Sequence, residues 1–131
     1  MLRKLEGLPP GLLGVYAEGK VTGDDYEKTL MPLLEEAHRA GRRVRLLYQL
    51  GPDFTKLTMG AYWDDFKVGM KYMRLFEMCA VVTDVEWIRT SVRLFRPLIP
   101  CPVNDYPNSE FKDAVAWLVE GGLESRPEMH P

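Results

Sequence analysis

Residues 43–66 read RVRLLYQLGPDFTKLTMGAYWDDF, and this stretch decides the fold. Its first part, 44–50, is a mostly apolar run that is typical of a buried strand. The segment 52–58, which begins with proline and aspartate, predicts a short loop. From position 59 the apolar residues recur at helical spacing, which predicts an amphipathic helix over 59–76. A strand, a loop and a helix in this order form the repeating unit of an α/β protein.

The predicted loop offers two hydroxyl side chains, Thr55 and Thr58. A loop at the carboxyl end of a parallel strand is where α/β proteins normally bind a ligand or partner. Both threonines are therefore candidate binding residues and possible phosphoacceptors. Thr58 also suits the N-cap of the following helix. A phosphate there would gain from the helix dipole, but the carboxylates of Asp64 and Asp65 would oppose it.

Before this stretch the sequence predicts a hairpin and a helix. Strands over 2–6 and 12–20 are joined by a segment rich in glycine and proline, which predicts an antiparallel pair. Thr22 and Asp25 form a plausible capping pair for a helix that ends near Gly41. Pro32 lies inside that helix and predicts a bend or a break, because proline lacks the backbone N–H.

After residue 76 the alternation of strands and helices continues. The predicted strands are 78–83 and 103–106. The predicted helices are 85–95, capped by Asp84, and 110–119, capped by Asn108 or Ser109 and terminated by Gly121 and Gly122. The pattern predicts an α/β fold with a mixed, mainly parallel sheet of about five strands, an N-terminal antiparallel hairpin and about four flanking helices. Residues 1–122 form a single domain in this prediction, and 123–131 form a C-terminal tail.

Composition narrows the classes of function. The chain has 131 residues and a formal net charge of −2, which disfavours a bare nucleic-acid-binding role. Its two cysteines do not indicate a disulfide framework. The first residues lack the apolar core of a signal peptide, and no apolar run reaches the length of about 18 residues that a membrane-spanning helix needs. We therefore predict a cytoplasmic location and no transmembrane segment.

Few residues indicate catalysis. The two histidines and two cysteines show no metal-ligand spacing, and no phosphate-binding glycine loop or nucleophile elbow is visible. Acidic pairs such as Asp64 and Asp65 lie in opening turns of predicted helices, where they stabilise the helix dipole. An acid–base role for such a pair is the alternative. The prediction is a protein without catalytic residues, metal or cofactor, and not an enzyme.

The helix over 59–76 carries a wide apolar arc that is rich in methionine and aromatic residues. Such an arc is most simply a core-facing stripe, and it can also line an apolar pocket or form a dimer face. Its candidate ligand- or partner-binding residues are Tyr62, Trp63, Phe66 and Met70, together with Thr55 and Thr58.

Basic residues recur on two of the predicted helices. They are Lys67, Lys71 and Arg74 on one helix and Arg89, Arg93 and Arg96 on the next. Each row is most simply a solvated face. If the rows adjoin, they could also meet an acidic partner or an anionic membrane surface.

Five short motifs in order make the chain similar to the SpoIIAA-like family, relatives of the STAS domains of anti-sigma-factor antagonists. They are GKVTGDDY at 19–26, VRLLY at 44–48, GAYWDD at 60–65, CAVVTDVEWI at 79–88 and FKDAVAWL at 111–118. The resemblance implies a small α/β domain without a settled activity. Anti-sigma-factor antagonists use a serine as the phosphoacceptor. The segment 51–60 contains no serine, and its hydroxyl side chains are those of Thr55 and Thr58. The fold also resembles lipid-exchange domains of the CRAL-TRIO type, which implies an apolar ligand.

From these observations we expect a non-enzymatic, STAS-like regulatory module. It would bind a protein partner, and the most direct partner would be a second copy of itself in a homodimer. The alternative is a carrier or sensor of a lipid or another apolar small molecule, which the arc over 59–76 favours.

Overall fold

The computed structural model describes residues 1–124, apart from the side chains of residues 62–66, 70 and 122–124. The strands are β1 (Leu2–Lys4), β2 (Leu12–Val21), β3 (Val44–Leu57), β4 (Phe76–Val82) and β5 (Val103–Tyr106). The α-helices are α1 (Gly23–Asp25), α2 (Met31–Arg39), α3 (Met59–Lys71), α4 (Glu86–Phe95) and α5 (Phe111–Glu124). A π-helix, η1 (Tyr26–Leu30), joins α1 to α2, and two short 3₁₀-helices are η2 (Arg96–Leu98) and η3 (Asn108–Glu110).

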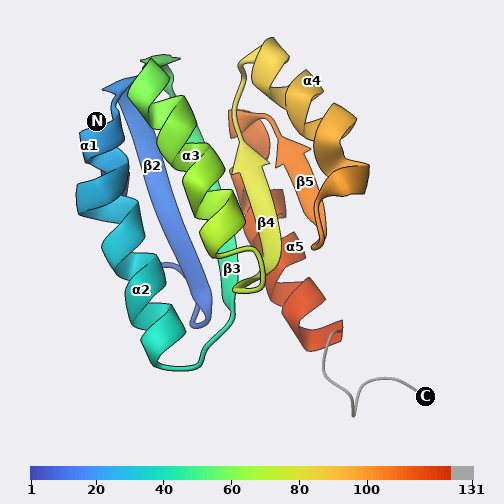
Figure 1. The fold of residues 1–131 in the computed structure, drawn as a ribbon. Coiled ribbons are helices and arrows are strands. Elements are labelled where there is room, and N and C mark those ends of the chain that lie inside the picture. The colour runs from blue at the N-terminus through green and yellow to red at the C-terminus, as the bar shows by residue number, and fades with distance from the viewer. Residues whose placement is uncertain (125–131) are drawn as a thin grey trace.

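The strands form one sheet in the order β1-β2-β3-β4-β5. β1 pairs with β2 antiparallel, and every later neighbour is parallel. Because parallel crossovers are right-handed, a strictly sequential order places each connecting helix on the same face of the sheet. Figure 1 shows α1, α2 and α3 in front of the sheet, α4 beside β5, and α5 behind. The predicted α/β fold, with its antiparallel hairpin and mainly parallel sheet, is confirmed.

The first helical segment begins as predicted, and it contains an irregular turn before Pro32 rather than a break. Thr22 and Asp25 form a reciprocal capping box: the Thr22 hydroxyl accepts from the Asp25 amide, and the Asp25 carboxylate accepts from the Thr22 amide. The π-helix η1 runs directly into α2, whose first turn contains Pro32. The Met31 amide donates to the Tyr26 carbonyl, so the helical backbone is irregular before Pro32 but continues through it.

The predicted loop after residue 51 is wrong, because β3 continues as an extended strand to Leu57. Thr55 therefore lies in a strand. Pro52 falls where the pairing with β2 shifts register, between the pairs Ala17↔Leu50 and Gly19↔Phe54, so its missing N–H interrupts no regular ladder.

Several other expected boundaries differ. The helix α3 ends at Lys71, and β4 begins at Phe76, two residues before the predicted strand. The N-caps also differ: α4 begins after Val85 rather than Asp84, and η3 begins after Pro107 rather than Asn108 or Ser109, both without a side-chain bond from the N-cap residue. The helix α5 runs through Gly121, which we had expected to terminate it. An added Cβ at Gly121 would lie 2.2 Å from the Met78 methyl, so this glycine allows close packing on β4.

The two faces of the sheet carry separate cores, since successive strand residues point to opposite sides. On β3, Leu46 and Leu50 face the front helices, whereas Leu47 faces α5. The rear core is completed by the buried residues Met78, Ala80, Val82, Ala114 and Leu118. On the front, β4 presents Cys79 and Val81 to the helical layer, where they remain only partly buried. This incomplete cover is where the candidate site lies.

Candidate functional site

A cleft of about 650 Å³ opens on the front face between α3 and α4, and we call it the α3–α4 cleft. Its floor comes from β3, β4 and β5, represented by Leu46, Cys79, Val81 and Val103. In Figure 1 the two helices stand apart, and β4 is visible between them. The volume falls within the range of about 300–1,000 Å³ that small-molecule sites occupy.

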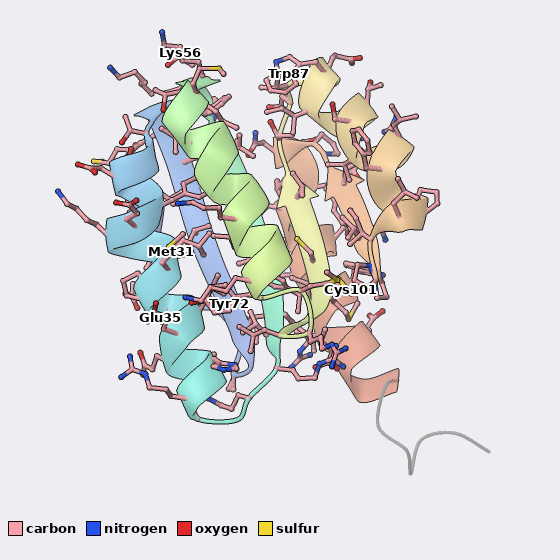
Figure 2. The ribbon with its side chains drawn as sticks, viewed as in Figure 1. Met31, Glu35, Lys56, Tyr72, Trp87 and Cys101 are labelled. Atoms are coloured by element: carbon pink, nitrogen blue, oxygen red, sulfur yellow. The ribbon has the colours of Figure 1, made fainter. Side chains whose placement is uncertain are left out.

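The walls of the cleft are also apolar. The helix α4 contributes Ile88, Val92 and Phe95, whose spacing of four and three residues places them on one helical face. Trp87 and Cys101 also line the cleft, and Figure 2 shows them toward opposite ends of the space between α3 and α4. Among the described residues of the lining, none is an acid, a lysine, an arginine or a histidine.

The side-chain hydroxyl groups among the described residues of the lining already have partners. The hydroxyls of Tyr26 and Tyr48 lie 2.7 Å apart and share a hydrogen bond. The Ser91 hydroxyl donates to the carbonyl of Trp87 at 2.7 Å. Burial raises the pKa of the Cys101 thiol, with the Arg43 charge acting in the opposite direction, so the thiol is neutral at physiological pH. The described lining therefore favours an occupant that is mostly apolar and carries no charge inside the cleft.

The wall formed by α4 is held to the sheet by an ionic cluster that the sequence did not reveal. Asp105 on β5 is the register partner of Val81 in the floor, and its side chain is only 3% exposed. Its carboxylate accepts hydrogen bonds from Arg89 Nε at 2.8 Å, Arg93 Nε at 3.2 Å and Arg96 at 3.1 Å. The predicted solvated face is therefore confirmed only in part: all three arginines converge on one acid, but the side chains of Arg93 and Arg96 remain partly exposed.

At the carboxyl edge of the sheet, where the sequence predicts a binding loop, Asn108 and Asp84 take part in structural hydrogen bonds. Asn108 accepts from Gln49 at 2.9 Å and donates through its side chain to the carbonyl of Leu50. The Asp84 carboxylate accepts from both the backbone and the side chain of Asn108. These bonds lower the pKa of Asp84, so it is ionised at neutral pH and keeps η3 against the strand ends.

The structure places two of the six predicted site residues. Thr58 is the N-cap of α3, and its hydroxyl accepts from the Ala61 amide at 3.2 Å. Thr55 is exposed near the end of β3, and neither threonine lines the α3–α4 cleft. The side chains of the other four, Tyr62, Trp63, Phe66 and Met70, lie outside the described residues.

Sequence reasoning missed the contributions of β4 and α4 to the cleft. The apolar run at 78–83 indicated a strand covered on both faces, but not that one face stays partly open. The sequence did contain a signal for the α4 wall. The apolar residues Ile88, Val92 and Phe95 recur at helical spacing beside the arginine row on the same helix.

Gly69 on α3 lines the cleft, and an added Cβ there would meet no described atom within 4 Å. We expect Gly69→Ala to raise the free energy of unfolding by about 0.5–1 kcal/mol, because alanine loses less backbone entropy in a helix. Urea denaturation measures this change. An unchanged or lower stability would mean that the glycine is needed for packing rather than leaving space in the cleft.

The described part of the chain shows neither a metal site nor a membrane-spanning helix. No group of three or more His, Cys, Asp or Glu side chains there is placed to hold a metal ion. No helix within residues 1–124 is both long enough and apolar enough to span a membrane.

Comparison with known proteins identifies the class. The SpoIIAA-like family model matches residues 12–119, so the chain belongs to this family. A crystal structure of an uncharacterized protein with a SpoIIAA-like fold from Shewanella loihica PV-4 is similar, with a TM-score of 0.72 and 27% identity over 90% of this chain and 92% of that one. No curated protein matches the chain. The fold is that of the STAS and SpoIIAA-like regulatory domains.

Proposed function

We propose that this domain binds an uncharged apolar small molecule in the α3–α4 cleft and acts as a carrier or sensor of that molecule. One observation carries the proposal: a cleft of about 650 Å³ whose described lining presents apolar side chains and hydroxyl groups that already have partners. Burial of an apolar ligand there would contribute roughly 25 cal/mol per Å² of surface removed from water.

The cleft changes the order of the two functions that the sequence favoured. Partner binding and homodimer formation rest on a complete fold without a catalytic set and on the family resemblance, whereas the apolar ligand has a space of suitable size and chemistry. The two roles are compatible within a regulatory domain. A ligand that binds one arrangement of α3 and α4 more tightly would shift the population of that arrangement, and a protein partner could respond to the shift.

We propose no chemical reaction in the α3–α4 cleft. The described lining lacks an acid, a histidine or a lysine that could transfer a proton, and burial keeps the Cys101 thiol neutral. The proposed activity is therefore binding without turnover.

The test uses N-phenyl-1-naphthylamine, an uncharged fluorophore that brightens in apolar surroundings. We expect saturable binding with a 1:1 stoichiometry, and we expect alkanes and long-chain alcohols to displace the probe. Native mass spectrometry of protein purified without detergent should show a retained apolar molecule. Absence of saturable fluorescence together with a ligand-free mass would contradict the proposal.

A further inference from the structure

Among the described residues, four of the eight exposed large apolar side chains lie together at the C-terminal end of α4. Leu94 and Phe95 are 69% and 53% exposed, and Leu98 and Ile99, which follow in and after η2, are 80% and 37% exposed. We call these four residues the α4–η2 surface. Apolar groups that adjoin in this way on a folded domain usually mark a contact with a partner or a membrane.

This surface is continuous with the mouth of the α3–α4 cleft. Phe95, Leu98 and Ile99 line the cleft as well as being exposed, and Leu94 lies one residue before Phe95 but outside the lining. Figure 1 shows α4 at the outer margin of the molecule, beyond β5. An occupant that covers the α4–η2 surface would therefore also cover one side of the cleft mouth.

The charge beside this surface is positive, although the whole chain carries −2. The segment 87–104 contains three arginines and no acidic residue. The single carboxylate of Asp105 offsets one of the three charges, which leaves an excess of two within residues 87–105. The side chains of Arg93 and Arg96 remain 57% and 41% exposed, so their guanidinium groups can also reach an external anion.

From this arrangement we propose that the α4–η2 surface docks on a bilayer containing anionic phospholipids, an inference that rests on the function proposed above. An amphipathic helix with arginines on one face and Trp, Phe and Leu on another is suited to lie in the plane of the lipid interface. Arg93 and Arg96 complement anionic headgroups, and the apolar residues enter the acyl boundary. The mouth of the cleft then faces the phase in which an apolar ligand is concentrated.

The experiment is co-sedimentation with vesicles of phosphatidylcholine alone and of phosphatidylcholine mixed with phosphatidylserine. We expect the protein to bind the anionic vesicles at least about tenfold more tightly, and we expect added salt to weaken the binding. Leu94→Glu should lower the affinity for anionic vesicles by about tenfold or more, because it places a charge in the acyl boundary. Arg93→Gln should lower the preference for the anionic vesicles.

The matched control is Met59→Glu. Met59 is 83% exposed at the start of α3 and lies outside both the cleft lining and the α4–η2 surface. This variant adds the same charge and should sediment like the unmodified protein. Equal sedimentation of Leu94→Glu and Met59→Glu would overturn the proposal, as would failure to bind anionic vesicles. Concentration-dependent dimer formation that Leu94→Glu abolishes, without vesicle binding, would assign the surface to a second copy instead.

Failure of docking can be told apart from failure of the proposed function. Binding of N-phenyl-1-naphthylamine is measured without vesicles and reports on the cleft, whereas sedimentation without added ligand reports on the α4–η2 surface. Because Leu94 does not line the cleft, Leu94→Glu should bind the probe as the unmodified protein does. Loss of vesicle binding with the probe affinity unchanged is the expected result for this variant.

Discussion

Val81→Trp should lower the affinity for N-phenyl-1-naphthylamine by at least about tenfold, or about 1.4 kcal/mol, without unfolding the domain. Val81 lies in the middle of the cleft floor on β4, between its register partners Tyr48 on β3 and Asp105 on β5. The added indole would occupy space that the probe needs. Because that space is open, the substitution should cause less overpacking than the same change in a filled core. Fluorescence titration measures the affinity, and thermal unfolding reports on the fold.

Thr90→Trp is the matched control for this variant. Thr90 is exposed on α4 and does not line the cleft, so the same side chain is added outside the site. We expect its probe affinity to stay within about twofold of the unmodified protein, as for surface substitutions in general. A Val81→Trp protein that is folded and binds the probe as tightly as the control would show that the ligand does not occupy this cleft.

Asp105→Asn should lower the free energy of unfolding by about 2–4 kcal/mol. The buried carboxylate is the shared anion for Arg89, Arg93 and Arg96, and asparagine would leave three guanidinium groups close together without a counter-charge. Removing one partner of a fully buried ion pair costs about 3–5 kcal/mol, and we expect less here because Arg93 and Arg96 are partly solvated. Urea denaturation at neutral pH measures the loss.

Asp113→Asn provides the comparison, because Asp113 is exposed in the first turn of α5 and should contribute at most about 1 kcal/mol through the helix dipole. If Asp105→Asn were no more destabilising than Asp113→Asn, the arginine cluster would not be what holds α4 to the sheet.

The pKa of Asp105 also determines how the stability of the domain depends on pH. Burial by itself raises the pKa of Asp105, but the hydrogen bonds and charges of Arg89 and Arg93 outweigh burial and hold the pKa below its usual value. Because the pKa of Asp105 is lower in the folded state, its ionised carboxylate stabilises the fold at pH values above the unfolded-state pKa of about 3.9. This stabilisation is lost as the pH falls through the folded-state pKa. The unfolding free energy should therefore fall on acidification below about pH 4, and less steeply for Asp105→Asn.

The fold was largely predictable because its signals are local. The capping pair of Thr22 and Asp25, the apolar strands and the helical spacing each depend on neighbouring residues, and all three appear in the structure. The extension of β3 was not predictable in this way. Gly51 and Pro52 have the composition of a turn, yet β2 pairs on both sides of them, and the Tyr16 ring occupies the space that a Cβ at Gly51 would need.

The site was less predictable, because the cleft forms where α3 and α4 do not pack against each other. Sequence spacing showed an apolar arc on the helix that follows β3, but not that α4 stands away from it over β4. The arginine row on α4 was visible, whereas its partner Asp105 follows the helix on another element. A pairing of this kind is set by the register of β5 against β4 and has no short-range signature.

The sequential strand order has a consequence for how this architecture can change. One side of the sheet is sealed by α5, whose contacts through Ala114 and Leu118 are fully buried, and the other carries the open site. Substitutions that widen, narrow or reshape the α3–α4 cleft should leave the rear layer intact as a source of stability. The shape of the cleft can therefore change by substitution while the rear layer keeps the domain folded.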